Sequence, residues 1–211
     1  MKQFVAIAGN IGVGKSTLVE KMCARFEWQP FIEGVVDNPY LADFYADMRA
    51  WSFHSQIFFL AQRLRDLRRL MDHATSVVQD RTVYEDAEIF AKNLYRQHLI
   101  SERDWKTYND LYHAVMQLLP PPDLVVYLQA SVETLRQRIA QRGREYEKKI
   151  APDYLARLNE LYAEWSSDFK LAPMLIVPAD RLDFVSNGEH LNLILEKIKD
   201  KLRGEQMVLF E

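Results

Sequence analysis

Short apolar runs alternate with longer amphipathic segments along the whole chain. The apolar runs cover residues 4–8, 30–32, 76–79, 124–128 and 174–177. Such runs, bounded by turn or polar residues, are typical of strands buried on both faces of a parallel sheet. Strands that alternate with helices predict an α/β fold, in which a five-stranded parallel sheet forms the middle of a three-layer sandwich flanked by helices.

Between these runs, apolar residues recur at helical spacing. The predicted helices cover 17–26, 39–48, 51–71, 87–99 (opened by Asp86), 101–118, 131–144, 152–171 and 189–202. The helix over 51–71 is apolar around more than half of its circumference, so we expect it to be buried on more than one side. Gln56 and Arg63 lie two turns apart on one face of this helix, and as polar groups there they need partners.

A glycine-rich loop follows the first apolar run and precedes the first amphipathic helix. It reads Gly9-Asn10-Ile11-Gly12-Val13-Gly14-Lys15-Ser16-Thr17. Three glycines let the backbone turn tightly and aim its N–H groups, together with the positive end of the helix, at a polyphosphate. Lys15 would reach the β and γ phosphates and the Ser16 hydroxyl would hold Mg²⁺. The alternative is a glycine-rich turn that binds nothing.

Acidic residues follow two other predicted strands. Glu33 follows the run 30–32, and Asp80-Arg81 follows 76–79. In an open parallel sheet the carboxyl ends of the strands form the ligand-binding edge, from which the glycine-rich loop also emerges. Glu33 could accept a hydroxyl proton during phosphoryl transfer, and Asp80 could approach Mg²⁺. The alternative for Glu33 is a solvated acid or a helix cap.

Three arginines surround a glycine near the end of the helix over 131–144. Arg138, Arg142 and Arg144 either form a solvated basic face or act as a lid, over about 138–150, that neutralises charge on the transferred phosphoryl group. The presence of the phosphate loop favours the lid.

Composition narrows the class of protein. With 211 residues, 48% apolar and 27% charged, the chain fits one domain over 1–211. A net charge of −3 argues against broad nucleic-acid binding. Cys23 is the only cysteine and lies in a predicted helix, which is typical of a small buried side chain in a reducing compartment. Neither a signal peptide nor a membrane span is indicated, so we expect a cytoplasmic protein.

At the level of motifs, the sequence resembles the deoxyribonucleoside kinases, most closely their bacterial deoxyadenosine/deoxycytidine kinase branch. The resemblance spans nearly the whole chain and rests on GNIGVGKST at 9–17, NPYLADFYAD at 38–47, WSFHSQ at 51–56, QDRTVYEDAEIFAKNLY at 79–95 and RIAQRGREYE at 138–147. It implies a P-loop kinase fold, ATP and Mg²⁺ as cofactors, a small-molecule deoxynucleoside as acceptor, and a homodimer.

The resemblance also implies roles for individual residues. Glu33 would deprotonate the nucleoside 5′-hydroxyl, and Arg81 would orient that base and the incoming phosphate. Asp80-Arg81-Thr82 stands where the family has Glu-Arg-Ser, which leaves direct or water-mediated contact of Asp80 with Mg²⁺ open. The remaining implied contacts are Tyr45 and Glu147 on the sugar 3′-hydroxyl, Gln56, Arg63 and Asp86 on the nucleobase edge, Phe90 and Trp51 along its faces, and Asp183-Phe184 on the adenine of the donor.

Substrate preference follows from these residues less directly. Gln56 offers both a donor and an acceptor, so it can pair with adenine or with cytosine. In the family, an arginine and aspartate pair at the positions of Arg63 and Asp86 marks enzymes for purine deoxynucleosides and deoxycytidine. We therefore expect deoxyadenosine to be favoured, with deoxycytidine and deoxyguanosine as further acceptors. The alternatives are a thymidylate-like nucleoside monophosphate kinase and a nucleotide-binding regulatory protein without turnover.

Overall fold

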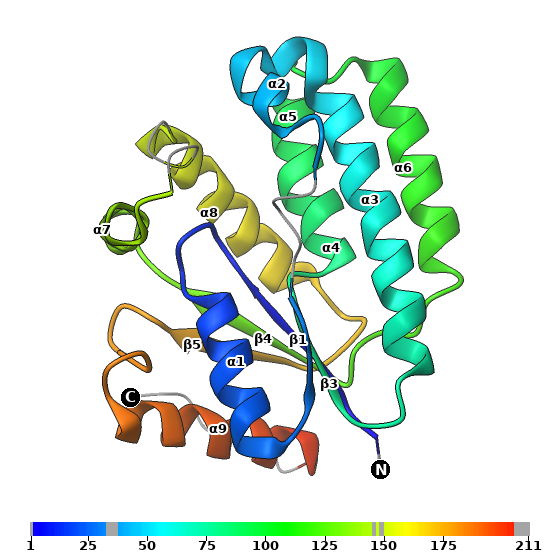
Figure 1. The fold of residues 1–211 in the computed structure, drawn as a ribbon. Helices are drawn as coiled ribbons and strands as arrows, with labels where there is room; N and C mark the ends of the chain where they lie inside the picture. The colour runs from blue at the N-terminus through cyan, green and yellow to red at the C-terminus, as the bar shows by residue number, and fades with distance from the viewer. Residues whose placement is uncertain (1, 33–37, 145–146, 148–149, 205–211) are drawn as a thin grey trace. The chain divides into compact units, whose positions relative to one another are not determined.

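The computed structural model describes residues 2–32, 38–144, 147 and 150–204 (Figure 1). Its contacts group into two compact units. Unit 1 comprises residues 1–32, 74–81 and 121–211, and unit 2 comprises residues 33–73 and 82–120. Each unit is therefore assembled from segments that are separated in the sequence. A single domain over the whole chain stays a prediction.

Unit 1 contains a five-stranded sheet. Its strands are β1 (Phe4–Gly9), β2 (Gln29–Phe31), β3 (Val77–Asp80), β4 (Leu124–Gln129) and β5 (Met174–Pro178). Their order is β2-β3-β1-β4-β5, and every neighbouring pair is parallel. The predicted five-stranded parallel sheet is confirmed, and no strand boundary differs from the prediction by more than one residue.

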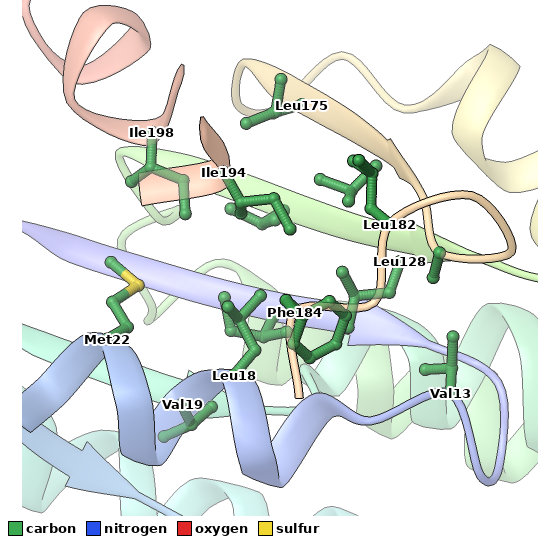
Figure 2. Close-up of a cluster of buried hydrophobic side chains, with 14 of the residues drawn as sticks. Val13, Leu18, Val19, Met22, Leu128, Leu175, Leu182, Phe184, Ile194 and Ile198 are labelled. Atoms are coloured by element: carbon green, nitrogen blue, oxygen red, sulfur yellow. The ribbon is translucent and has the colours of Figure 1, made fainter. Parts of the chain in front are cut away.

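Helices cover both faces of this sheet. They are α1 (Lys15–Phe26), α7 (Val132–Arg142), α8 (Pro152–Asp168) and α9 (Gly188–Leu202). Alternate residues of β1 and β4 join Leu18 of α1 and Ile194 of α9 in one apolar core cluster (Figure 2). On the opposite face, Tyr127 of β4 stacks on Tyr162 of α8. Within unit 1 the three layers predicted from the sequence are therefore confirmed.

The core also accounts for the single cysteine. Cys23 is 7% exposed and belongs to the apolar cluster between α1 and the sheet. Burial raises the pKa of its thiol to about 11. The prediction that Cys23 is a small buried side chain is confirmed.

Unit 2 is helical. Its helices are α2 (Leu41–Ala46), α3 (Met48–Asp72), α4 (Val83–Glu85), the π-helix η2 (Asp86–Ala91), α5 (Lys92–Arg96) and α6 (Glu102–Met116). Helix α3 packs against α2, η2 and α6, which confirms that it is buried on more than one side. Across the described ranges, no helix combines the length and the hydropathy that crossing a bilayer requires.

Three helix starts in unit 2 differ from the sequence prediction by two residues or more. Helix α2 begins at Leu41, not at residue 39. Helix α3 begins at Met48, before the predicted residue 51, because the Asp47 side chain caps it by accepting a hydrogen bond from the Ala50 N–H at 3.1 Å. Asp86 does not open a helix, because helical backbone starts earlier, at Val83. There Thr82 and Glu85 form a capping box, in which each side chain accepts from the other's backbone N–H.

Candidate active site

The phosphate loop of unit 1 connects β1 to α1 and confirms the predicted strand, loop and helix. Gly9, Gly12 and Gly14 adopt φ values of 146°, 83° and 105°, which L side chains rarely adopt. Space is limiting as well, because a Cβ on Gly12 would lie 2.6 Å from Cγ1 of Ile139. The three glycines are therefore required by the conformation of the loop itself.

Two side chains at the start of α1 point into this region of unit 1. Lys15 is 7% exposed, and its Nζ donates hydrogen bonds to the carbonyl oxygens of Gly9 at 2.8 Å and Asn10 at 3.2 Å. The Ser16 hydroxyl donates to Oδ2 of Asp80 at 2.5 Å, and Asp80 is 2% exposed. A hydroxyl and a carboxylate are thus held together at the carboxyl end of β3, beside β1.

This oxygen pair fits Mg²⁺. Magnesium in phosphoryl-transfer sites is bound by one or two protein oxygens, and waters and substrate phosphates supply the remaining ligands. Among the residues that the structure describes, no group of three or more His, Cys, Asp or Glu side chains could hold a metal. Ser16 and Asp80 would therefore share the ion with the phosphates of the donor.

Arg81 follows directly after β3 with an unusual backbone. Its N–H donates to the carbonyl oxygen of Ile7 at 3.0 Å, and its φ is 67°, in the left-handed region. A non-glycine residue there carries local strain, which functional sites often retain. The side chain is 7% exposed. Glu33, the predicted catalytic base, lies outside the described residues.

The three predicted lid arginines have two different environments. Arg138 bridges the phosphate loop to the segment after β5, because its Nη1 donates to Val13 O and its Nη2 to Ala179 O, both at 2.8 Å. Arg142 instead holds the buried Glu147 carboxylate, with Nη2 2.6 Å from both carboxylate oxygens and Nε 3.0 Å from Oε2. Arg144 Nη1 lies 3.5 Å from Oε1 of the same carboxylate.

Helix α7 ends within the predicted lid segment 138–150. Gly143 is its C-cap with φ 69°, and apart from its chain neighbours and the helix backbone no heavy atom of the described residues lies within 4 Å of a Cβ built there. Of the predicted lid over 138–150, residues 145–146 and 148–149 lie outside the described residues.

The predicted donor-base segment 183–184 has one exposed and one buried member. The exposed Asp183 accepts hydrogen bonds from the N–H groups of Val185 and Ser186, both at 3.1 Å. The hydrogen bond from Ser186 is the main cause that lowers the pKa of Asp183. Phe184 is 1% exposed, lies in the core cluster (Figure 2), and would be 3.0 Å from a Cβ on Gly14. The Phe184 ring therefore packs against the phosphate loop at Gly14.

In unit 2, three predicted nucleobase contacts are buried polar groups. Gln56 and Arg63 on α3 are 4% and 3% exposed, and Asp86 on η2 is 3% exposed. Arg63 Nε donates to Asp86 Oδ2 at 2.7 Å, so the structure pairs these two residues. Oε1 of Gln56 is buried without a hydrogen-bond partner among the described residues.

The aromatic residues predicted to contact the substrate lie on α2, α3 and η2 of unit 2. Trp51 stacks on Tyr40 with ring centroids 5.8 Å apart. Tyr45 of α2 packs against the apolar cluster built on Phe44, and Phe90 of η2 is half-buried. The joint role of Tyr45 and Glu147 on a sugar hydroxyl stays a prediction.

Sequence reasoning missed the part of α8 that contacts the phosphate loop. The Tyr162 hydroxyl donates to Gly9 O at 2.8 Å, and Asn10 Nδ2 donates to Leu155 O at 3.0 Å and to Asn159 Oδ1 at 2.8 Å. The available signal was the polar Asn159 inside the apolar stripe of the helix predicted over 152–171.

Comparison with known proteins identifies the family of this chain. The family model described as deoxynucleoside kinase matches residues 5–203. The deoxyadenosine/deoxycytidine kinase of Bacillus subtilis is 35% identical, over 96% of this chain and 94% of its own length. The deoxyguanosine kinase of the same organism is 34% identical, over 93% and 96%.

A solved structure agrees in fold as well. Deoxyadenosine kinase from M. mycoides, with the products dCMP and a flexible dCDP bound, superposes with a TM-score of 0.84. It is 32% identical, and the match covers 93% of this chain and 99% of that one. The chain therefore belongs to the deoxynucleoside kinase family, whose members are ATP-dependent phosphotransferases.

Proposed function

We propose that this protein transfers the γ-phosphate of ATP to the 5′-hydroxyl of a 2′-deoxynucleoside, with deoxyadenosine favoured and deoxycytidine and deoxyguanosine as further acceptors. A phosphate loop alone suits many nucleotide-binding proteins. The observation that carries the proposal is the buried set of Gln56, Arg63 and Asp86 in unit 2. Gln56 Oε1, which has no hydrogen-bond partner among the described residues, lies on the same helix as Arg63, and Arg63 is paired with Asp86.

The donor side of the reaction falls to the loop of unit 1. Backbone N–H groups of Gly12 to Thr17 and the positive end of α1 would bind the phosphates, and Lys15 would reach the β and γ groups. Bound Mg²⁺ would neutralise charge on the phosphate oxygens. Ser16 and Asp80 would hold that ion, as the oxygen pair described above fits it.

The acceptor side needs a base and positive charge. Glu33 would take the proton of the 5′-hydroxyl as the oxygen bonds to the γ-phosphorus and the bond from that phosphorus to the β-phosphate oxygen breaks, which releases ADP. The proton would remain on the Glu33 carboxyl until product leaves. Arg81 would orient Glu33 and the phosphoryl group. Arg142 and Arg144 could neutralise charge on that group only after loosening from Glu147, which their ion pairs hold here. Glu147 would then be available for the sugar 3′-hydroxyl, together with Tyr45.

Base selection rests on hydrogen-bond matching. Adenine and cytosine each present an exocyclic amino donor beside a ring nitrogen acceptor, and a glutamine side chain pairs with such an edge in two bonds. The unused Gln56 Oε1 would accept from the amino group. Arg63, held by Asp86, would donate to a further acceptor of the base. A site that leaves such buried groups unpaired rejects a mismatched ligand strongly.

A homodimer in the cytoplasm is also proposed from the resemblance. Light scattering of the purified protein tests the homodimer. We expect a measured mass of twice the 24.8 kDa of one chain.

A panel of the four deoxynucleosides with Mg-ATP tests the proposal. We expect the highest kcat/KM on deoxyadenosine, and best activity on thymidine would contradict the base assignment. Gln56→Glu is the matched variant, because its acceptor-only carboxylate removes the donor that pairs with the ring nitrogen of adenine. It should reduce kcat/KM for deoxyadenosine and shift preference toward deoxyguanosine.

Glu33→Ala tests the base separately. Turnover should collapse while ATP affinity stays nearly unchanged, because the carboxylate acts on the acceptor. Unchanged turnover would remove Glu33 from that role.

A further inference from the structure

Two asparagine side chains connect the phosphate loop of unit 1 to helix α8. Asn10, the second residue of the loop, is 3% exposed, and its Nδ2 donates to Leu155 O at 3.0 Å and to Asn159 Oδ1 at 2.8 Å. Asn159 Nδ2 donates in turn to Ala130 O at 3.0 Å, between β4 and α7. The loop is therefore joined to two later segments of the same unit.

These hydrogen bonds all run in one direction. Asn10 Oδ1 accepts from the Ile11 N–H at 2.7 Å, so Asn10 uses its acceptor on the loop and both hydrogens of its amide on α8. At the other end the Ala130 carbonyl can only accept, so Asn159 turns its nitrogen toward Ala130 and its oxygen toward Asn10. A backbone N–H and a backbone carbonyl thus fix the orientation of both amides.

We call this set the amide relay; it runs from Ile11 N–H through the side chains of Asn10 and Asn159 to Ala130 O. Each side chain in it must both donate and accept, which an amide does, whereas a carboxylate only accepts and an apolar group does neither. Asn159 is half-buried on α8, and its side chain forms its hydrogen bonds with Asn10 and Ala130.

The amide relay bears on phosphate binding because the loop starts at these residues. Without Asn159, one hydrogen of the buried Asn10 amide loses its acceptor, which favours loop conformations that bring this amide to water. A loop that adopts its binding conformation for only a fraction of the time has an apparent Kd raised by the inverse of that fraction.

We propose that Asn159 is a positioning residue for the phosphates of the donor, because it fixes the Asn10 side chain and through it the start of the phosphate loop. The inference rests on the proposed function, since it takes this loop as the site of the donor phosphates.

Asn159→Ala removes both hydrogen bonds of this side chain. The Kd for Mg-ATP should then rise about tenfold. Inorganic tripolyphosphate probes the loop alone, so its Kd should rise by the same factor. The KM for ATP should rise as well, whereas kcat and the KM for deoxyadenosine should stay within about twofold of the unmodified chain, because the acceptor side is unchanged.

Asn192→Ala is the matched control, because it makes the same replacement at an exposed position of α9, another helix of unit 1. Calorimetric titration of the full chain, well below the melting temperature of each variant, measures both Kd values. Equal ATP affinity in Asn159→Ala and Asn192→Ala, with ATP bound by the unmodified chain, would overturn the inference and leave the proposed function standing. A lower melting temperature of Asn159→Ala with unchanged ATP affinity would also overturn it, because Asn159 would then contribute only to stability.

A stability cycle without any nucleotide tests the amide relay by itself. Asn10→Ala and Asn159→Ala each remove the bond between the two amides, so the double variant should lower the melting temperature by less than the sum of the single effects. Additive effects would contradict the relay. Failure of the unmodified chain to bind ATP or tripolyphosphate would contradict the proposed function, and the inference with it, whatever the cycle shows.

Discussion

Breaking the ion pair of Arg63 and Asp86 should destabilise the fold more when Asp86 is removed than when Arg63 is removed. The pair is 2.7 Å long, and both side chains are 4% exposed. Removing one partner of a buried pair costs about 3–5 kcal/mol, whereas replacing both partners by apolar residues is often neutral. In Asp86→Ala a guanidinium remains buried, and it cannot lose its proton. In Arg63→Met a carboxyl group remains, and it can become neutral by binding a proton.

The magnitude can be read from thermal unfolding followed by circular dichroism. At about 2–4 °C per kcal/mol for a chain of this size, Asp86→Ala should lower the melting temperature by roughly 6–20 °C. Arg63→Met should lower the melting temperature by less than Asp86→Ala does.

The double variant separates stability from function. Arg63→Met combined with Asp86→Ala should recover most of the melting temperature that Asp86→Ala loses, yet it should remain inactive on deoxyadenosine, because both polar groups are gone. A double variant as unstable as Asp86→Ala would refute the reasoning that a buried charge deprived of its Asp86 partner dominates. Full activity of the double variant would refute the role of the pair in binding the base.

Three further predictions concern unit 1. Asp80→Asn should raise the Mg²⁺ concentration for half-maximal turnover by about tenfold or more, because a charged ligand becomes neutral; an unchanged Mg²⁺ dependence would contradict the Ser16 and Asp80 site. Cys23, with a pKa of about 11, should react with iodoacetamide at pH 8 at least about 100-fold more slowly in the native than in the unfolded chain, measured by mass spectrometry. Partial burial opposes ionisation of Asp180, but hydrogen bonds from Thr134 and Ser131 outweigh it and lower the pKa below 3.8. Its contribution to stability should therefore be present above pH 4 and be lost as pH falls further, and Asp180→Asn should make acid unfolding less steep.

Local sequence patterns were sufficient to predict the strands, the glycine-rich loop and the polar residues on the apolar helix. The apolar runs became the five parallel strands, and the three glycines of the loop adopt the backbone angles that only glycine adopts readily. Gln56 and Arg63 were conspicuous because polar groups on an apolar helix need partners, and Arg63 has one in Asp86. The capping box of Thr82 and Glu85 was also present in the sequence, although the prediction placed the helix start at Asp86.

Other features depend on contacts between distant segments. The π-helix over Asp86–Ala91 differs from an α-helix by a shift of one hydrogen-bond partner, which residue propensities do not encode. Arg81 adopts a left-handed backbone conformation although it is not a glycine, so its residue type gives no signal of that conformation. The bond from Tyr162 to Gly9 spans 153 positions, and burial of the Phe184 ring against Gly14 depends equally on the packed core. These features required the structure.

The central claim is that the acceptor is the 5′-hydroxyl of a free deoxynucleoside. Its most direct test supplies the purified chain with Mg-ATP and either deoxyadenosine or deoxyadenosine monophosphate, and identifies the products by mass spectrometry and phosphorus NMR. The account predicts one ADP for each deoxyadenosine 5′-monophosphate formed from the nucleoside, and little reaction with the monophosphate. Preferential formation of the diphosphate from the monophosphate, or ATP binding without deoxynucleoside-dependent ADP release, would contradict it.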